Sequence, residues 1–332
     1  METSMTSDNI YEAQDLTPEI YKIFAGVYSD FRVAAINEYK FELEPLSYED
    51  FISSIEKGLI KCIVLSENKF PTAFLVYTTV ISEAIELNVI HCLGDDDLIE
   101  KRRVLLEKFL EETEELRKEK IVCYPMLGSQ GDFTADIAKY GFKFVGLAVL
   151  RFVMQNASSK TIFNTLELPE LDTNYEIKPW SEDYIEEAVA ITNRAFIDTT
   201  DALFDPRFKT PEGTRDVLEN ITNGTYGEFL PESTSVLMYC GKPCGFCFTN
   251  LTGGRIANIP IFAIDKPFQG KGLSKYLLKT SIQKMLDWVE NGEKDIEELN
   301  TTTETNNFQA LKMYRGVGFK EDYSYAQSYT TI

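Results

Sequence analysis

Histidine is almost absent from this chain, with one in 332 residues. Serine and cysteine nucleophiles are commonly activated by a histidine base, and structural zinc sites commonly bind through imidazole or several thiolates. The single histidine, His91, therefore leaves little room for a Ser–His or Cys–His mechanism. It also leaves Cys240, Cys244 and Cys247 without a fourth ligand at zinc spacing. We predict no metal site.

Long apolar runs and targeting signals are also missing. No run approaches the roughly 18 residues that span a bilayer, and the N-terminus lacks a basic region followed by an apolar one. The sequence thus predicts a cytoplasmic protein that does not contact membranes and is a monomer or a homodimer. In that setting its cysteines should be buried, reduced thiols. They number six and lie in strand-like runs: Cys62, Cys92, Cys123, Cys240, Cys244 and Cys247.

Positive charge is scarce, with 33 Lys and Arg against 53 Asp and Glu and a net charge of −20. Acidic residues outnumber basic ones in both halves of the chain. Nucleic acid is therefore not an expected partner, because binding it depends on neutralising phosphates. The acidic surface would attract cationic amines or basic peptides, and it also keeps the protein soluble.

The chain is organised around residues 259–289. A short β-rich run leads through a turn with Gly270 and Gly272 into a segment with helical apolar spacing. Glycine lets a backbone approach a ligand closely, and the first amides of the following helix favour an anion. The turn, residues 269–274, reads Gln-Gly-Lys-Gly-Leu-Ser and resembles the pyrophosphate loop of the GNAT superfamily of N-acetyltransferases. Ser274, where that family has Gly or Ala, is a small departure.

A second motif follows about thirty residues later. Asn307, Ala310, Tyr314 and the pair Gly318-Phe319 match the family's second signature in order and spacing. This resemblance implies acetyl-CoA as co-substrate and a small-molecule amine or peptide amine as acceptor. It implies that Tyr314 protonates the departing thiolate. The coenzyme-binding residues implied are Phe262, Ala263 and Ile264 beside the pantetheine arm, Gln269, Gly270, Lys271, Gly272, Leu273 and Ser274 at the pyrophosphate, and Asn307 at the arm.

The residue that takes the proton from the attacking amine is left open by the sequence. Many relatives place a glutamate on the strand before the phosphate loop, but residues 255–264 contain no carboxylate. Candidates are Glu304, Asp265, Glu228, Glu232, or a water held by Asn258 and the threonines 301–303.

Both halves of the chain share one predicted order of strand, two helices, three strands, helix, strand, helix and strands. The fold class expected is α/β with a mixed sheet, as tandem GNAT-like domains similar in arrangement to mycothiol synthases. Aligning Gly141-Phe142 with Gly318-Phe319 sets Gln130 opposite Asn307 and Ile137 opposite Tyr314. The first half has Gly94-Asp95-Asp96-Asp97 where the second has its phosphate turn, and three carboxylates would repel a pyrophosphate. The N-terminal domain is therefore predicted to be degenerate.

Domain boundaries are predicted at residues 1–155 for the degenerate domain and 174–332 for the catalytic domain. The polar stretch 156–173 shows no clear period and is typical of a linker. Two further details are predicted in the second half. Arg255–Ile264 should form one strand, and Phe319–Tyr329 should form a closing pair of strands.

Three functions fit these features. The first is an acetyl-CoA dependent N-acetyltransferase that acts by direct attack in a ternary complex. The second is a sensor that binds acetyl-CoA without turnover, which fits if the catalytic base is truly absent. The third is a tandem-domain aminoacyl or acyl transferase acting on a carrier such as charged transfer RNA, which the acidic charge and the intact loop disfavour.

Overall fold

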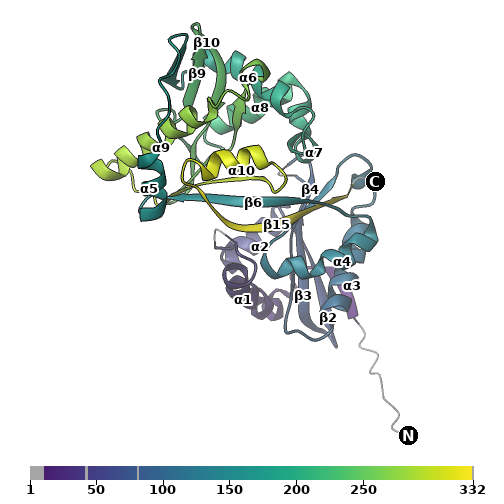
Figure 1. Ribbon diagram of the computed structural model, residues 1–332. Helices are drawn as coiled ribbons and strands as arrows, with labels where there is room; N and C mark the ends of the chain where they lie inside the picture. The colour runs from purple at the N-terminus through teal and green to yellow at the C-terminus, as the bar shows by residue number, and fades with distance from the viewer. Residues whose placement is uncertain (1–10, 42–43, 81, 331–332) are drawn as a thin grey trace. The chain divides into compact units, whose positions relative to one another are not determined.

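The computed structural model describes residues 11–41, 44–80 and 82–330. The chain forms two compact units (Figure 1). The N-terminal unit spans Met1–Val145 together with Tyr325–Ile332, and the C-terminal unit spans Gly146–Ser324. The sequence also predicts a strand at residues 9–13, and residues 9 and 10 of it lie outside the described part.

The N-terminal unit contains a twisted sheet of mostly antiparallel strands in the order β1-β2-β3-β4-β5-β15. Within it only β4 and β5 pair in parallel. Its strands are β1 (Tyr11–Asp15), β2 (Lys61–Glu67), β3 (Phe70–Thr78), β4 (Ile85–Cys92), β5 (Val122–Met126) and the end of β15 (Lys320–Thr330).

Helices cover both faces of this sheet. One core joins α1 (Tyr21–Asn37) and α2 (Tyr48–Glu56) to Val64 and Phe74, whereas the other joins α3 (Leu98–Glu112) and the short α4 (Thr134–Ile137) to Ile63 and Leu75. Neighbouring strand residues thus serve opposite cores, because side chains alternate between the faces of a sheet.

The C-terminal unit contains two sheets. The first has the order β6-β14-β12-β11-β8 and the second β13-β10-β9-β7. Their strands are β6 (Lys143–Val153), β7 (Tyr175–Pro179), β8 (Glu228–Phe229), β9 (Ser235–Tyr239), β10 (Lys242–Cys247), β11 (Asn250–Gly253), β12 (Ile256–Asn258), β13 (Phe262–Ile264) and β14 (Glu298–Glu304).

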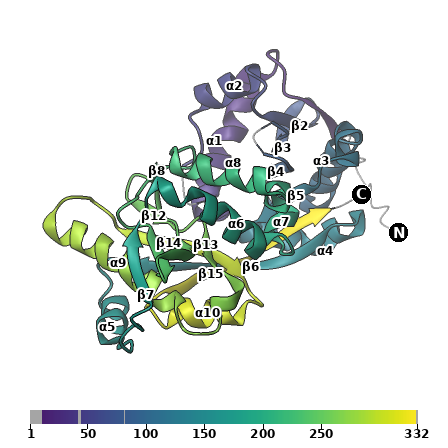
Figure 2. The same ribbon diagram turned by 90° about the horizontal axis from the view of Figure 1, so that it is seen from above.

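Two groups of helices enclose these sheets (Figure 2). A core with α6 (Ile185–Phe196), α7 (Asp201–Phe204) and α8 (Pro211–Thr222) covers one face. A second core joins α5 (Ala157–Thr165), α9 (Ser274–Asn291) and α10 (Phe308–Arg315) to the other face. The site predicted from the sequence lies where β13 leads into α9.

Three local predictions are wrong. Residues 255–264 form two strands, β12 and β13, because Pro260 has no N–H and the chain passes there from one sheet to the other. Residues 319–329 give a single strand, β15, rather than a pair. The polar stretch 156–173 contains helix α5, whose first amides are capped by the Asn156 side chain. Phe163 is the large apolar residue that α5 buries, and a single buried position of this kind cannot produce a visible helical periodicity in the sequence.

Along the chain, the two points at which one unit ends and the other begins lie within strands β6 and β15. Residues 147–153 of β6 pair with β14 in the C-terminal unit, and residues 326–330 of β15 pair with β5 in the N-terminal unit. The two units are therefore not divided at the polar stretch 156–173. A fragment of residues 174–332 would lack the strand that β14 pairs with over seven residues.

Candidate active site

The strand edge on which an acyl-CoA could lie is created where β12 gives way to β13. β12 pairs in parallel with β14 as far as Asn258 and Asn300, and Ile259 N donates to Asn300 O at 3.0 Å. After Pro260 the chain pairs only with β10, so β13 is the terminal strand of its sheet. The strands β13 and β14 thus part after Asn258.

Hydrogen bonding fixes which groups of β13 are available. Phe248 N donates to Ile261 O and Asp265 N donates to Cys244 O, at 2.9 Å each. Because backbone groups alternate along a strand, those of Phe262 and Ile264 face away from β10. The Ile264 carbonyl accepts from Gln269 Nε2 at 2.7 Å. The Phe262 N–H and C=O and the Ile264 N–H then remain; we call this strip, Phe262–Ile264, the open edge.

The predicted phosphate loop follows directly. Gly270 and Gly272 have φ of +74° and +75°, a region that suits glycine, and a β-carbon on either would meet no heavy atom within 4 Å. In the described part of the chain, none of the backbone N–H groups of residues 270–274 donates to a protein acceptor. Leu273 is buried in the core and anchors the turn. The loop is a cradle of amides at the start of an 18-residue helix.

Two lysines add positive charge at this turn. Lys271 Nζ lies 5.2 Å from the centre of the Phe268 ring. A β-carbon on Gly316 would lie 3.4 Å from Lys275 Nζ, so the start of α9 is next to the end of α10. All six residues predicted to hold a pyrophosphate, 269–274, are therefore brought together between the open edge and α10.

Tyr314 lies where the two strands part. It is buried, its ring centre is 6.4 Å from that of Phe262 on β13, and its hydroxyl bonds to Thr301 on β14. Burial raises the pKa of Tyr314, an effect that exceeds the opposite influence of the Thr301 hydrogen bond. The phenol is therefore protonated at neutral pH and placed next to the open edge.

Asn307 occupies the other end of α10. Its Oδ1 accepts from Ala310 N at 3.1 Å, so the side chain caps the helix, and the residue is exposed. Its Nδ2 is left for another acceptor, since no contact of this atom is found within the described residues. Asn307 is not brought against Phe262 or the loop by any contact of its side chain.

Most of the acids proposed as a base are already paired. Asp265 receives two hydrogen bonds from Arg194, of 3.2 and 2.9 Å, Glu228 pairs with Lys294 and Glu232 pairs with Lys284, at 2.7 Å each. Glu304, at the end of β14, instead accepts from the Thr200 hydroxyl of the turn before α7.

Asp201, which the sequence reasoning missed, directly follows Thr200, whose hydroxyl donates to Glu304. Although Asp201 is exposed, the protein atoms around its carboxyl group raise its pKa, and the charge of Glu304 raises it further. The Thr199 hydroxyl donates to Asp201 at 3.2 Å and acts in the opposite direction. No sequence motif marks Asp201, because α7 is only four residues long and the bond between Thr200 and Glu304 joins residues 104 positions apart in sequence.

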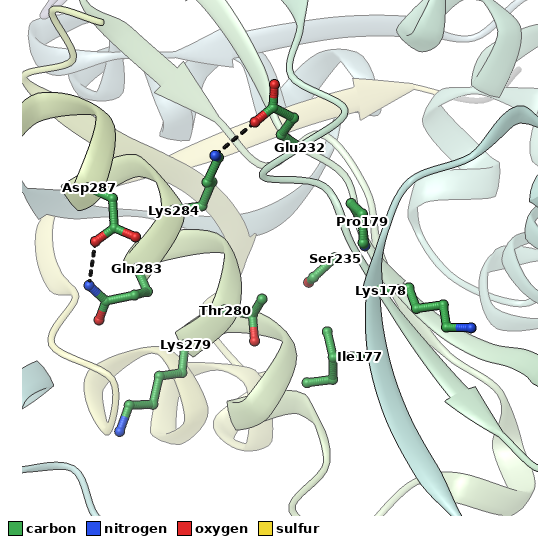
Figure 3. A pocket seen from close by; sticks show the side chains of 10 residues that line it. All are labelled: Ile177, Lys178, Pro179, Glu232, Ser235, Lys279, Thr280, Gln283, Lys284 and Asp287. Atoms are coloured by element: carbon green, nitrogen blue, oxygen red, sulfur yellow. Dashed lines mark hydrogen bonds and ion pairs between the residues drawn. The ribbon is translucent and has the colours of Figure 1, made fainter. Parts of the chain in front are cut away.

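A separate hollow of about 570 Å³ lies along α9 (Figure 3). Its lining includes Glu232, one of the candidate bases, but no residue of the open edge, the phosphate loop or α10. Its charges are largely paired within the protein: Lys284 binds Glu232 at 2.7 Å, and Lys279 Nζ donates to Leu166 O at 2.8 Å. It therefore differs from the phosphate loop, whose donors are free.

The N-terminal unit contains a matching pair of strands. β4 and β5 pair in parallel at Ile85–Val122 and Glu86–Cys123 and then part. Beyond that point the Gln130 side chain accepts from Ile90 N at 3.2 Å and from the Tyr124 hydroxyl. Gln130 is buried, so this edge is filled by the protein itself.

The exposure of the cysteines differs from the prediction at one residue. All six thiols are free; five are buried and Cys240 is exposed, which corrects the prediction for that residue. Burial raises the pKa of Cys244 and Cys247 to about 12. The described side chains bring no three His, Cys, Asp or Glu together where a metal could bind. Helices long and apolar enough to cross a membrane are likewise not found among the residues that the structure describes.

Comparison with solved structures reveals the fold. A GCN5-related N-acetyltransferase from Sphaerobacter thermophilus aligns with a TM-score of 0.61 and 13% identity over 96% of this chain and 95% of its own. A tandem GNAT protein from the clavulanic acid biosynthesis pathway aligns with a TM-score of 0.58 and 10% identity, over 97% and 98%. A GCN5-related glucosamine N-acetyltransferase region of a fungal multi-domain β-N-acetylglucosaminidase gives a TM-score of 0.63 and 11% identity, over 98% of this chain and 38% of that one.

Sequence comparison covers a smaller part of the chain. No curated protein matches it. The likeness to mycothiol synthases stays a prediction. Residues 198–319 match the acetyltransferase (GNAT) family, and the α/β fold of the chain is that of tandem GNAT proteins.

Proposed function

We propose that this protein transfers an acetyl group from acetyl-CoA to a primary amine, by direct attack within a ternary complex. Acyl transfer is the chemistry of the family that residues 198–319 match. The observation that carries the proposal is the arrangement of the open edge, the phosphate loop and Tyr314 within one unit. Residues 174–332 hold all three, and they form the catalytic part of the chain.

The chemistry of the free groups fits acetyl-CoA. The pantetheine arm carries two amides, which can pair with the Phe262 N–H and C=O and the Ile264 N–H as an added strand would. The pyrophosphate needs donors and positive charge, which the amides of Gly270–Ser274 supply together with the start of α9. Lys271 and Lys275 add charge, and Asn307 Nδ2 is available to the arm.

The chain's own groups account for the transfer. An amide N–H of the open edge stabilises the carbonyl oxygen as charge develops on it. The amine nitrogen forms the new C–N bond, the C–S bond breaks, and Tyr314 donates its proton toward the sulfur. Because its pKa lies above a thiol's roughly 8.5, complete transfer is uphill, and the hydrogen bond to the departing sulfur supplies much of the stabilisation.

The experiment is a test of binding followed by turnover. Calorimetry with acetyl-CoA measures affinity and the number of sites, and thiol release is then followed with butylamine, putrescine and a peptide with a free α-amine. We expect one site per chain and thiol release that depends on the amine. Binding without amine-dependent release would support the sensor instead, and acceptance of an aminoacyl-tRNA but no free amine would support the third function. Absence of binding would refute the proposal.

A further inference from the structure

The two faces of β14 present different chemistry. Leu299 packs in the core with α9 and α10, and Thr301 bonds to Tyr314, so the odd-numbered residues face α10. Side chains alternate along a strand, so Glu304 belongs to the opposite face, and its bond to Thr200 places it toward α7. Tyr314 therefore packs against one face of β14, and the Glu304 side chain projects from the opposite face.

β13 shows the same division. The Phe262 ring is next to that of Tyr314, whereas Ala263 is buried in the core with α6 and α8. The open edge thus has α10 on one side and α6 and α7 on the other. An acyl group held along this edge is accessible to Tyr314 from one face and to the carboxylates of the α7 side from the other.

Two acids on the α7 side, Asp201 and Glu304, stand out from their neighbours by their lack of a basic partner among the described residues. Arg194 forms an ion pair with Asp265, and Arg207 forms ion pairs with Asp205 and Asp216. In the described part of the chain neither Asp201 nor Glu304 forms an ion pair with a Lys or Arg, and Glu304 is the charged group that acts on Asp201. Two neighbouring carboxylates without a cation favour a positively charged ligand. A primary ammonium group has that charge, and it must lose a proton before it can attack.

Resting on the proposed function, we propose that Asp201 and Glu304 bind the acceptor ammonium and take its proton, on the side of the open edge opposite Tyr314. Thr200 positions Glu304, and the buried Ala202 fixes α7 in the core. The acceptor is thereby narrowed to amines that are cationic at neutral pH.

The protons balance. The ammonium gives one proton to the carboxylate pair, and the neutral nitrogen then attacks the thioester carbon. The nitrogen gives up its second proton to the pair as the C–S bond breaks, while Tyr314 protonates the sulfur. The pair releases two protons to solvent and Tyr314 recovers one, so the products are an amide, a free thiol and one released proton.

The test compares Glu304→Gln and Asp201→Asn with Glu232→Gln, which removes an acid already paired with Lys284. Steady-state rates are measured from pH 6 to 9.5 at saturating acetyl-CoA, with butylamine and with aniline, which is neutral at pH 7. We expect kcat/KM for butylamine at pH 7 to fall at least about ten-fold in either site variant, since a positioned base contributes about 10² to 10⁴. The loss should shrink at high pH and be smaller for aniline, whose neutral nitrogen gives the pair only the second of the two protons. Glu232→Gln should behave as the wild type.

Equal losses for both amines at every pH, or no loss, would overturn the assignment. Calorimetric affinity for acetyl-CoA, unchanged in the variants, shows that they are folded. If the wild type turns over no amine, the proposed function fails, and the pair is judged by calorimetric binding of butylammonium in the presence of CoA. Weaker binding by Glu304→Gln than by the wild type would then support the pair, and equal binding or none would refute it.

Discussion

Each unit contains two parallel strands that begin as a pair and then part, and the two units satisfy the exposed backbone differently. The last parallel pairs are Glu86–Cys123 in one unit and Asn258–Asn300 in the other. Four residues further along, Ile90 N is bonded to the Gln130 side chain, whereas Phe262 belongs to an edge without a protein partner in the described chain. A backbone group that the protein itself satisfies is not available to a ligand.

The residue that fills the N-terminal edge, Gln130, aligns in sequence with a residue that does not fill the C-terminal edge. Gln130 aligns with Asn307, but its amide points inward and is buried, whereas Asn307 is exposed and caps α10. The turns differ as well. Gly94 is followed by Asp95, Asp96 and Asp97, where the other unit has two glycines and a lysine. Under the proposed function, the N-terminal unit has the parting strands but neither the open edge nor the glycine turn that would bind acetyl-CoA in the other unit.

The largest expected effect comes from making the two turns alike. Gly272→Glu adds a carboxylate where the pyrophosphate should lie, and we expect the affinity for acetyl-CoA to fall at least about 100-fold, because like charges repel. Gly94→Glu is the matched control, since both glycines have positive φ and open space above them. It should leave one full-affinity site per chain by calorimetry. Two sites in the wild type, or binding that survives Gly272→Glu, would refute the comparison.

The next largest effect is expected to distinguish Tyr314 from Tyr124, the two buried tyrosines beside the parting strands. Tyr314→Phe keeps the ring packed against Phe262 and Phe319, so coenzyme affinity should change little. If the hydroxyl protonates the sulfur, kcat should fall about 10- to 1,000-fold at saturating amine, because water replaces a positioned acid only in part. The defect should shrink as the pH falls. The control, Tyr124→Phe, removes the hydroxyl that bonds to Gln130 and should leave kcat unchanged. An unaffected kcat in Tyr314→Phe would make Tyr314 a purely structural residue.

The sequence predicted the parts of the molecule that are local along the chain. The order of most helices and strands, the loop at residues 269–274 and the helix with Tyr314 follow from periodicity, glycine spacing and two motifs. These features are visible because each depends on neighbouring residues. In the structure the Phe262 ring lies 6.4 Å from that of Tyr314 and the loop follows β13, whereas the roles of these residues stay predictions.

Features that depend on contacts between distant segments were not predicted. The division of residues 255–264 between two sheets depends on partners in β10 and β14. Asp201 is brought toward Glu304 by the bond between its neighbour Thr200 and Glu304, two residues 104 positions apart in sequence. The burial of Gln130 likewise depends on Ile90 and Tyr124. A polar residue next to a strand gives no sign in sequence of which way its amide points.

The smallest expected effect tests whether Gln130 closes the N-terminal edge. Gln130→Leu keeps the bulk of the side chain but leaves Ile90 N–H and the Tyr124 hydroxyl without their acceptor, which should lower the free energy of unfolding by about 1–3 kcal/mol. Hydrogen exchange at the Ile90 amide should become faster, and calorimetry should still find one acetyl-CoA per chain, because Asp95–Asp97 remain. Asn307→Ala is the matched variant. It removes a helix cap worth about 1 kcal/mol and, if Asn307 binds the arm, also weakens coenzyme affinity.

A Gln130→Leu protein with unchanged stability and unchanged exchange would show that the amide does not hold this edge. A second molecule of acetyl-CoA bound by that variant would show that the glutamine alone, and not the acidic turn, separates the two units in coenzyme binding.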